Sequence, residues 1–525
     1  MGVTAKAFEG RDLLDRFRFF NYQKSFIQIS KIVYTNLKKL LTNYCFIAII
    51  ELSNRFEIIS TKKNGGILVK EEIQVTNQRY RLGYHLMPKS GWINDPNGFS
   101  YFKGYYHMFY QYYPYAAEWG PMHWGHARSK DMIHWETLPT ALVPGDMESG
   151  CFSGSAIEHN GKLWLIYTGH HYFEPNDNES FYENQNLAYS EDGVHFTKYE
   201  GNPVLRVPAD NTKHFRDPKV WKEGDTFYMV LGSQGEDELG RALLFASKDL
   251  INWERVSILS KAKNLKEEGY MWECPDFFHL DGQDVLLMSP QGLEADGDRF
   301  RNLNQTGYIM GQLGEDKVLS RGEFVEIDNG HDFYATQTML TPDGRRVMVA
   351  WMNAWDSDMH EKQDGWAGGF TIPRELHIKD GHMYQQPVKE MEALRTAKLI
   401  AGVMETGHEY ELPRTAELNL AFEAADGELF TITDGEHNLT IGADTEGGRL
   451  VIQRNTKDGE RAAQVADFAN LKLQIFVDKT SAEIFVNEGE RTFTERIYWD
   501  APLTIEMGSS CQAVVYKLEE ETNKY

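Results

Sequence analysis

A short β unit recurs five times along the chain at a nearly constant period. Each copy is a glycine-containing turn followed by a strand of aromatic or aliphatic residues, as in Lys103–Tyr112 and Asp343–Met352. The glycines lie 57, 63, 58 and 62 residues apart, at Gly104, Gly161, Gly224, Gly282 and Gly344. All-β units repeated at this spacing are typical of propeller blades, which pack on one another because a single sheet cannot bury both its faces. We therefore predict a five-bladed β-propeller over residues 80–383.

A second element keeps the same period. Ser129–Trp135, Ser190–Phe196 and Ser247–Trp253 share a Ser-x-Asp-x-x-x-aromatic pattern, and the copies start 61 and 57 residues apart. A tandem of unrelated hairpins would not hold two elements in step, so this element supports repeat architecture.

The periodicity ends near residue 385. Short alternating segments follow, among them 417–422, 428–433 and 471–486, and polar turns join them. This pattern is typical of a β-sandwich, which we predict over residues 396–525. The fold class is therefore all-β, with a linker near Gln386–Val388. Two domains also suit a chain of 525 residues, which is longer than one core usually organises.

Residues 1–75 differ in composition from the rest of the chain. The first 70 residues hold 12 Lys and Arg against 5 Asp and Glu, whereas the complete chain has a formal net charge of −24. The segment 27–50 could form a basic amphipathic helix with a membrane or targeting role. Its most apolar part, Cys45–Ile50, is too short and too far from the start for a signal peptide. We expect a poorly ordered extension outside both domains.

Charge and cysteine usage exclude several classes of function. A net charge of −24 repels phosphate backbones and anionic lipids, so we expect neither a nucleic-acid partner nor a membrane partner. The four cysteines are far apart in the sequence, fit no metal-ligand spacing and suit a reducing compartment. No apolar run approaches the roughly 20 residues of a membrane span. We expect a cytoplasmic protein, and the sequence leaves the oligomeric state open.

Chemically distinctive motifs precede the repeated glycines by about ten residues. They are Trp92–Gly98, Phe152–Ser155, Arg216–Val220, Glu273–Asp276 and Asp332–Gln337. If the repeated strand is the second of each blade, these motifs lie on the innermost strands, where equivalent positions converge on the axis. We therefore expect Asp95, Asp217 and Glu273 to face one another.

Three carboxylates in one pocket need a chemical reason, because bringing like charges together costs free energy. Retaining glycoside hydrolysis supplies one, since it uses a carboxylate nucleophile and a second carboxyl about 5–5.5 Å away that protonates the leaving oxygen. A calcium site built from the same acids and a solvated acidic rim are the other interpretations. No Asp-rich calcium loop accompanies these residues, which favours catalysis.

The motifs resemble the signature blocks of glycoside hydrolase family 32. Trp92–Gly98, Phe152–Ser155, Arg216–Pro218 and Glu273–Pro275 occur in the family's order, and the resemblance runs from about Tyr84 to Tyr516. The family contains invertases, sucrose-6-phosphate hydrolases, inulinases and levanases. The resemblance implies a five-bladed propeller with a β-sandwich and hydrolysis through a covalent fructosyl-enzyme. It also implies that Asp95 is the nucleophile, Glu273 the general acid and base, and Asp217 the group that grips the fructose hydroxyls.

The same resemblance implies supporting roles. Asn94 and Gln111 would hydrogen-bond the fructosyl ring, and Arg216 would orient the acids. Trp119, Phe152 and Ser153 would shape the pocket. Further residues could belong either to the pocket or to the core, namely Trp92, Trp351 and Tyr334. Cys274 is expected to be a small packed side chain beside the acid. His170 and His171 follow a repeat strand and could lie near the leaving group, but we expect exposed loop residues.

The segment Trp119–His126 resembles the corresponding block of bacterial sucrose-6-phosphate hydrolases. We therefore expect sucrose 6-phosphate as the substrate, with plain sucrose as the second expectation and no metal or organic cofactor. A fructosyltransferase and a non-catalytic fructan-binding protein are the alternatives from other classes. Because the nucleophile must be ionised while the acid is protonated, the rate should follow a bell-shaped pH profile in the mildly acidic to neutral range.

Overall fold

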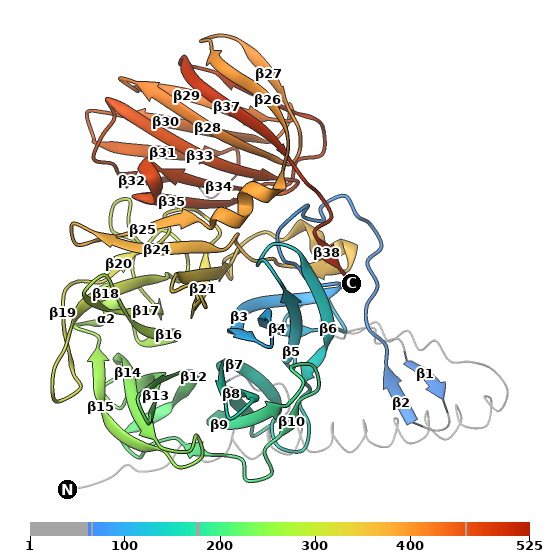
Figure 1. Cartoon of the computed structure of the whole chain (residues 1–525), viewed down its shortest axis with the longest axis vertical. Helices are drawn as coiled ribbons and strands as arrows, with labels where there is room; N and C mark the ends of the chain where they lie inside the picture. Colours follow the sequence, from blue (N-terminus) through green and yellow to red (C-terminus); the bar gives the residue numbers. More distant parts are fainter. Residues whose placement is uncertain (1–60, 65–66, 175–178, 457–458) are drawn as a thin grey trace, which may run out of the picture. The chain divides into compact units, whose positions relative to one another are not determined.

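The computed structural model describes residues 61–64, 67–174, 179–456 and 459–525. These residues form a β-propeller followed by a β-sandwich (Figure 1), and both belong to one compact unit. The predicted extension falls mainly on residues 1–60, which lie outside the described residues, as does the helix expected over 27–50. At its end, β1 (Thr61–Asn64) and β2 (Ile67–Lys70) pair as an antiparallel hairpin.

Five sheets make up the propeller region. The first contains β3 (Gly91–Phe102), β4 (Tyr105–Tyr113), β5 (His123–Ser129) and β6 (Trp135–Leu142). The second contains β7 (Gly150–His159), β8 (Lys162–Tyr172), β9 (Phe181–Ser190), β10 (Thr197–Lys198) and β11 (Leu205–Arg206). The third contains β12 (Asn211–Glu223), β13 (Thr226–Gly235), β14 (Gly240–Ser247) and β15 (Glu254–Lys261).

The other two sheets follow in the same order. The short helix α2 (Leu265–Glu268) leads into a sheet of β16 (Met271–Leu280), β17 (Gln283–Gln291), β18 (Gly307–Leu313), β19 (Leu319–Arg321) and β20 (Val325–Glu326). The last sheet contains β21 (Tyr334–Leu340), β22 (Arg346–Trp351), β24 (Arg374–Lys379) and β25 (His382–Pro387), with the 3-10 helix η1 (His360–Asp364) and β23 (Trp366–Ala367) in its long connection.

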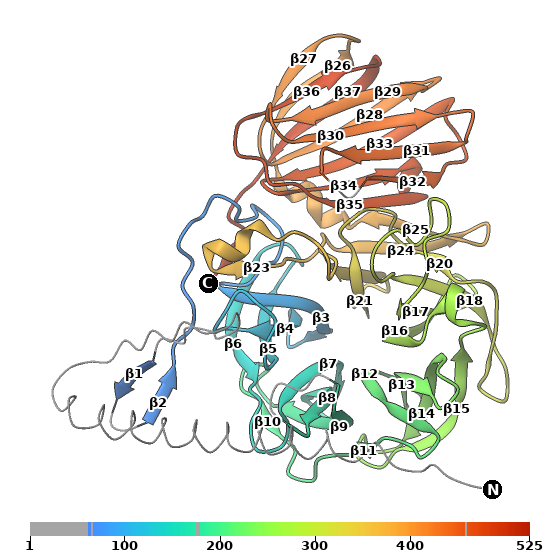
Figure 2. The same ribbon diagram turned by 180° about the vertical axis from the view of Figure 1, so that it is seen from behind.

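The first strands of the five sheets form a closed ring. β3 contacts β7, β7 contacts β12, β12 contacts β16, β16 contacts β21, and β21 returns to β3. Figures 1 and 2 show these strands innermost from both sides of the molecule. The ring is also tied at its seam, because β23 from the last sheet's connection pairs in parallel with β3 of the first. This arrangement places the motif-bearing strands at the axis, as the repeat predicts.

Both repeated sequence elements are turns. The five repeated glycines join the first and second strands of their sheets and have φ between 56° and 88°, a region that favours glycine. In the Ser-x-Asp element the aspartate accepts backbone N–H groups two and three residues later, as Asp131, Asp192 and Asp249 all do. These side chains close the turn before the fourth strand, which explains why the pattern occurs once in each of the first three sheets.

Two six-stranded sheets form the sandwich. The 3-10 helix η2 (Lys389–Leu394) precedes a sheet of β26 (Arg395–Met404), β28 (Ala416–Glu423), β33 (Asn470–Asp478), β34 (Ser481–Val486), β35 (Arg491–Arg496) and β37 (Cys511–Leu518), with η3 (Asn487–Gly489) before β35. The other sheet contains β27 (Glu409–Leu412), β29 (Gly427–Thr433), β30 (Asn438–Asp444), β31 (Arg449–Arg454), β32 (Glu460–Gln464) and β36 (Leu503–Met507).

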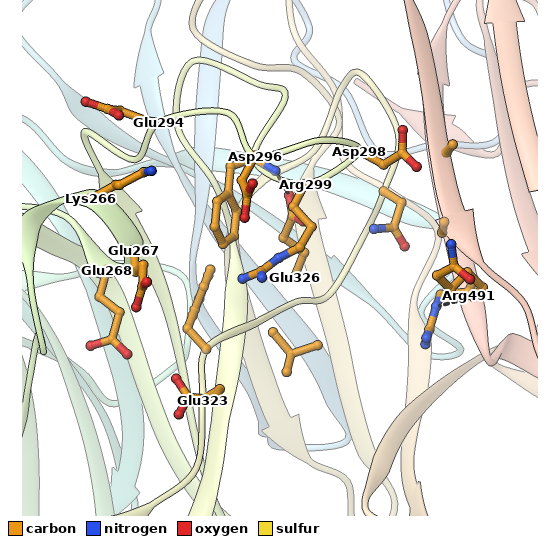
Figure 3. Close-up of a pocket in the computed structure, with 17 residues that line it drawn as sticks. Lys266, Glu267, Glu268, Glu294, Asp296, Asp298, Arg299, Glu323, Glu326 and Arg491 are labelled. Atoms are coloured by element: carbon orange, nitrogen blue, oxygen red, sulfur yellow. Dashed lines mark hydrogen bonds between the residues drawn. The ribbon is translucent and has the colours of Figure 1, made fainter. Parts of the chain in front are cut away.

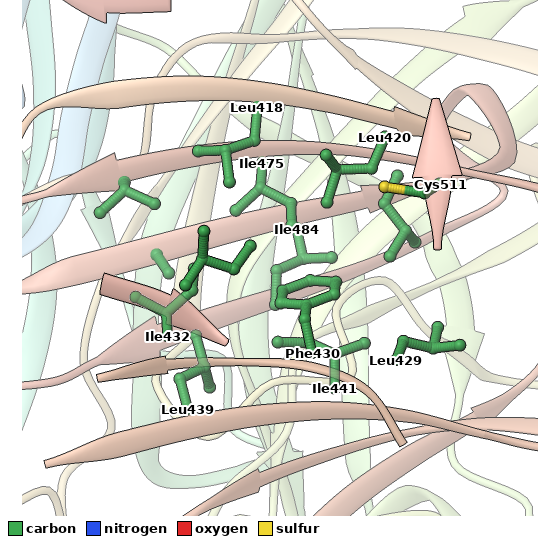
Figure 4. Close-up of a cluster of buried hydrophobic side chains, with 14 of the residues drawn as sticks. Leu418, Leu420, Leu429, Phe430, Ile432, Leu439, Ile441, Ile475, Ile484 and Cys511 are labelled. Carbon is green, nitrogen blue, oxygen red and sulfur yellow. The ribbon is translucent and has the colours of Figure 1, made fainter. Parts of the chain in front are cut away.

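The sandwich core lies between these sheets. Alternate residues of β30 are buried, as expected for strands with one buried face. Leu418, Ile475 and Ile484 from one sheet pack with Phe430 and Ile441 from the other (Figure 4). The propeller covers the outer face of the sandwich sheet that contains β33 and β34. Phe476 and Phe485 of these strands belong to the hydrophobic cluster of the propeller. The last strand, β38 (Asn523–Lys524), leaves the sandwich and pairs in parallel with β6 of the propeller.

Candidate active site

Every innermost strand breaks its pairing register at its sequence motif. The shifts lie between Ile93 and Pro96, Phe152 and Gly154, Arg216 and Lys219, Glu273 and Asp276, and Tyr334 and Thr336. Asp217, Cys274 and Ala335 have φ of 64°, 47° and 50° at these places. A bulge re-aims the side chains beside it, and such irregularities are common next to active sites. The bulges bring consecutive side chains of each motif to the same end of the axis.

Asp95 on β3 accepts hydrogen bonds at both carboxylate oxygens. Asn94 Nδ2 donates to Oδ1 at 3.0 Å, and Ser153 Oγ on β7 donates to Oδ2 at 2.5 Å. Asn94 is itself held by Trp92, whose Nε1 donates to Asn94 Oδ1 at 2.8 Å. Burial raises the pKa of Asp95, the charge of Glu273 adds to this, and the donors from Ser153 and Asn94 act against it.

Cys274 links the three predicted acids. It follows Glu273 on β16, its backbone N–H donates to Asp217 Oδ2 at 2.9 Å, and its thiol donates to Asp95 Oδ2 at 3.5 Å. Burial and the nearby carboxylates raise the pKa of this thiol well above its usual range, so it stays a protonated donor. Cys274 is thus more than the small packed side chain that the sequence suggested.

Asp217 is the second predicted acid and lies on β12. It is 6% exposed, and its backbone N–H donates to Thr168 Oγ1 at 2.9 Å. Burial raises its pKa well above the usual range, and the charges of Glu273 and Asp95 raise it further while Arg216 lowers it. Perturbation of this kind, by burial together with specific charges in a cavity, is typical of functional sites.

Glu273 has donors on both of its oxygens. Arg216 Nε and Nη2 reach Oε1 at 3.0 and 2.8 Å. Gln291 Nε2 and Tyr334 OH reach Oε2 at 2.8 and 2.5 Å. Tyr334 and Gln291 come from β21 and β17, so three neighbouring sheets fix the orientation of this carboxyl group.

A second, buried glutamate stands behind Arg216. Glu183 on β9 is 2% exposed and lies 3.6 Å from Arg216 Nη1 and 3.2 Å from His170 Nδ1. It also accepts the backbone N–H of Phe215 at 2.8 Å. Burial works to raise the pKa of Glu183, but Arg216, His170 and that N–H together lower it to about 2. Arg216 therefore pairs with two carboxylates, those of Glu183 and Glu273.

All nine predicted site residues line one cavity of about 310 Å³, a volume at the lower end of the range for small-molecule sites. Gln111 donates from β4 to the carbonyl of Cys151 at 3.0 Å. Trp119 meets Phe152 edge to face with ring centroids 6.0 Å apart. The predicted residues in the lining are Asn94, Asp95, Gln111, Trp119, Phe152, Ser153, Arg216, Asp217 and Glu273.

The structure also resolves the residues that the sequence left open. Tyr334 and Trp92 are buried and hydrogen-bond into the site, whereas Trp351 is a fully buried packing residue. The expectation of an exposed loop was wrong for His170, which is 4% exposed on β8 and stacks on Phe152 at 4.1 Å. The expectation was also wrong for His171, which lies on the same strand, is half-buried and stacks on Tyr182 at 4.3 Å.

Several residues of the cavity were not predicted, namely Tyr172, Phe181, Glu183, His214 and Trp355. Glu183 lies on the third strand of its sheet, Phe181 begins the same strand, and Trp355 lies in the long connection of the last sheet. None belongs to the motifs that precede the repeated glycines, so the periodicity carried no signal for them.

A larger cavity of about 490 Å³ lies between the fourth propeller sheet and β32 of the sandwich (Figure 3). Its lining is rich in acids but contains none of the predicted site residues. Several of these acids form ion pairs, as Glu268 does with Arg321, Asp298 with Arg449 and Glu323 with Lys263. Within the described ranges, no helix has the length and apolar character needed to cross a membrane.

Comparisons with known proteins agree with this architecture. The model of the glycosyl hydrolases family 32 N-terminal domain matches residues 85–387, and the model of the family 32 C-terminal domain matches residues 386–518. A sucrose-6-phosphate hydrolase of Escherichia coli is 42% identical, over 79% of this chain and 88% of the relative. A raffinose invertase of the same species is 44% identical, over 79% of this chain and 89% of the relative. Among solved structures, a mutant β-fructofuranosidase of Bombyx mori in complex with sucrose has a TM-score of 0.81 and 41% identity, over 86% of this chain and 96% of that one.

Proposed function

Because the chain belongs to glycosyl hydrolase family 32, we propose that it is a retaining β-fructofuranosidase. It cleaves the fructosyl bond of sucrose or sucrose 6-phosphate through a covalent fructosyl-enzyme. The observation that carries this proposal is the convergence of Asp95, Asp217 and Glu273, from three different sheets, on one cavity.

Asp95 is the nucleophile in the first step. One of its oxygens attacks the anomeric carbon of the fructosyl unit, and the bond from that carbon to the glucosyl oxygen breaks. Asp95 must be ionised to attack, and the donors from Ser153 and Asn94 favour the ionised form against the effect of burial. These hydrogen bonds also hold the carboxylate in one orientation, which lowers the entropic cost of reaching the transition state.

Glu273 is the general acid of that step and the general base of the next. It donates its proton to the departing glucosyl oxygen, so that a neutral alcohol leaves. In the second step it takes a proton from water, whose oxygen attacks the anomeric carbon and releases Asp95. Arg216, Tyr334 and Gln291 contact both oxygens of Glu273 and keep it oriented while it changes protonation state.

Asp217 holds the fructosyl hydroxyls. Its Oδ2 accepts the N–H of Cys274, and its position beside the other acids gives it a role in stabilising the positive charge that develops on the ring. Asn94 and Gln111 bind the same ring, while Trp119, Phe152 and Ser153 shape its pocket. Residues 80–383 would form the catalytic domain and 396–525 the accompanying sandwich. The described cysteines are unpaired, which supports a cytoplasmic location.

Trapping of the intermediate tests the proposal. Glu273→Gln should lose most activity on sucrose but retain the first step on a fructoside with a nitrophenolate leaving group, which needs no protonation. The fructosyl-enzyme should then accumulate, and peptide mass spectrometry should locate it on Asp95. A label on another residue, or none in a correctly folded variant, would contradict the assignment. The double variant Glu273→Gln with Asp95→Asn, which lacks the nucleophile, is a control for nonspecific labelling.

Product analysis separates hydrolysis from fructosyl transfer. At high sucrose concentration a hydrolase releases glucose and fructose in equal amounts, because water takes the fructosyl unit. A transferase would instead yield oligosaccharides and an excess of free glucose. A fructan-binding protein would give no turnover at all.

A further inference from the structure

We propose that the sandwich domain helps to position the leaving glucosyl unit, because it holds the turn of the propeller that presents Trp355 to the catalytic cavity. This inference rests on the proposed function, since it concerns the same cavity and the same cleavage. It gives a positioning role to four residues, which we call the latch: Asp332, Ser357, Arg454 and Arg496. None of the four lines the cavity, so the latch acts on the substrate through Trp355.

Trp355 lies at the mouth of the cavity. It is 37% exposed, which is more than any other residue of the lining. Asn94, Gln111 and Ser153 are in contrast buried, with 4% exposure or less. A disaccharide whose fructosyl unit reaches Asp95 therefore extends toward the mouth, where its glucosyl unit meets Trp355. The indole ring offers a large apolar face to the C–H groups of a hexose.

The position of Trp355 depends on a turn in the long connection between β22 and β23. The backbone N–H of Ser357 donates to the carbonyl of Ala354 at 3.1 Å, and the N–H of Ala354 donates to Ser357 Oγ at 2.8 Å. These two hydrogen bonds close a four-residue turn with Trp355 at its second position. The indole stacks on Trp92 with ring centroids 6.1 Å apart and meets Trp351 edge to face at 5.1 Å. The Ser357 hydroxyl therefore helps to set where the indole stands.

Asp332 fixes the direction of that hydroxyl group. Ser357 Oγ donates to Asp332 Oδ1 at 2.6 Å, so the hydroxyl accepts one hydrogen bond and donates another. Asp332 is 1% exposed and lies two residues before Tyr334, which contacts the general acid. Burial works to raise the pKa of Asp332, but the charge of Arg454 and the donors from Ser357 and the Arg496 backbone lower it. Asp332 is therefore an ionised acceptor, and its hydrogen bonds are stronger than those between neutral groups.

Both sheets of the sandwich contact Asp332. Arg454, the last residue of β31, donates from Nη1 to Asp332 Oδ2 at 2.6 Å, and the backbone N–H of Arg496, the last residue of β35, donates to the same oxygen at 2.8 Å. The backbone N–H of Asp332 donates to the carbonyl of Thr494 at 3.1 Å. Arg454 Nη1 also donates to the carbonyl of Arg496 at 2.7 Å, which joins the two strands where they contact Asp332. The sandwich thus holds one carboxylate oxygen while Ser357 binds the other.

The same sandwich strand offers a matched control. Arg449, the first residue of β31, also reaches across to the propeller, where its Nη1 lies 2.9 Å from Asp298 Oδ1. Asp298 lines the larger cavity, whereas Arg454 leads through Asp332 to the turn of Trp355. The two arginines therefore make similar contacts between the domains, and they differ in the part of the propeller that each contact holds.

The test compares kcat/KM of the full chain on sucrose and on methyl β-fructofuranoside, whose small leaving group does not reach Trp355. Ser357→Ala removes the hydroxyl group at a partly exposed turn and should lower kcat/KM on sucrose about tenfold, while the value for the methyl fructoside stays within about twofold. Trp355→Ala should give the same pattern, and Ser357→Thr, which keeps the hydroxyl group, should recover most of the activity on sucrose. Equal losses on both substrates, or no loss on sucrose, would overturn the inference. Absence of turnover of both substrates by the parent chain would instead overturn the proposed function.

Variants of the two arginines test the contribution of the sandwich. Arg454→Met should lower kcat/KM on sucrose several-fold and leave the methyl fructoside unchanged, whereas Arg449→Met should change neither value. Combining Arg454→Met with Ser357→Ala should cost little more than Ser357→Ala alone, because both changes act through one turn. Each variant is assayed well below its own melting temperature, so that unfolding does not contribute. Additive losses in the double variant, or the same loss in Arg449→Met, would contradict a role for the latch; Ser357→Ala decides the matter if Arg454→Met fails to fold.

Discussion

Two of the buried groups of charged side chains among the described residues are balanced in opposite ways. The first, which we call the catalytic cluster, comprises Asp95, Glu183, Arg216, Asp217 and Glu273. The second lies between the propeller and the sandwich and comprises His85, Asp328, Arg374, Asp478 and Glu483; we call it the interface cluster.

Each carboxylate of the interface cluster contacts a cation. His85 lies 2.7 Å from Asp478 and 2.8 Å from Glu483, and Arg374 lies 2.9 Å from Asp328 and 2.5 Å from Glu483. Burial opposes ionisation of His85, Asp478 and Glu483, but the charged partners of these groups outweigh it. The pKa values of Asp478 and Glu483 are lowered, and that of His85 is raised to about 9.

The catalytic cluster lacks this balance. Arg216 pairs with Glu273 and Glu183, but within the described part of the chain no cation lies within 4 Å of Asp95 or Asp217. Their pKa values are accordingly raised. Paired buried charges stabilise one arrangement of the domains, whereas unbalanced charges make a site that can transfer protons and stabilise a cation. Both clusters are buried, so burial does not distinguish them. The catalytic cluster differs from the interface cluster because not all of its carboxylates are paired with a cation.

The largest effect is expected from neutralising the catalytic cluster. Asp95→Asn removes the nucleophile with little change in shape, so kcat/KM on sucrose should fall by ~10^4-fold or more, equivalent to at least about 5.5 kcal/mol. The melting temperature should rise or stay constant, because a repelled buried charge disappears. A markedly less stable variant would show that favourable interactions do balance the buried charge of Asp95.

Removing a charge from the interface cluster, in contrast, should lower the stability of the protein. Arg374→Met leaves Asp328 and Glu483 without their cation and should destabilise the protein by about 3–5 kcal/mol. Denaturant unfolding monitored by tryptophan fluorescence measures this loss. Arg128→Met is a matched control, because the Arg128–Glu136 pair is partly exposed and should contribute no more than about 1 kcal/mol. Similar losses for both variants would contradict a special role for the interface cluster.

The interface cluster should also make stability depend on pH. The folded-state pKa of His85, about 9, lies above the unfolded value of 6.5. Its contribution is therefore complete below about pH 6.5, declines as the pH rises and is lost above about 9; it amounts to ~3 kcal/mol. Thermal unfolding of the parent and of His85→Gln across this range measures the difference. If both lose stability in parallel, another group is responsible.

Within the catalytic cluster, the charge of Glu183 should also affect activity. Glu183→Gln leaves Arg216 to Glu273 alone, which strengthens that pair and hinders protonation of the general acid. We expect kcat/KM on sucrose to fall about tenfold, or ~1.4 kcal/mol, with the alkaline limb of the pH profile moving to lower pH. A purely structural role would lower activity without moving that limb, and Glu183→Asp should recover part of the lost activity.

The smallest effect concerns the acid limb of the same profile. Because the pKa of Asp95 is raised, activity should fall at a pH above the ordinary range of an aspartate as the nucleophile becomes protonated. Ser153→Ala removes a donor to Asp95 Oδ2, which raises this pKa further. The acid limb should therefore move to higher pH in a profile of kcat/KM. A shift to lower pH would contradict the direction of the Ser153 contact.

The sequence by itself determined the repeat, the position of the motifs on the innermost strands and the convergence of the three acids. These follow from local rules, because turn glycines and strand alternation act within a few residues and the period carries them around the ring. The nine predicted site residues line one cavity for this reason.

Only the tertiary structure decided how the charges are balanced. The bulges turn Cys274 toward both aspartates, and β9 brings Glu183 to Arg216 from outside any motif. His85 meets Asp478 and Glu483 across 393 and 398 residues of chain. Electrostatic compensation depends on distances of a few ångströms between residues far apart in sequence. No local pattern records those distances, so the balance of charge in each cluster is decided only in the folded chain.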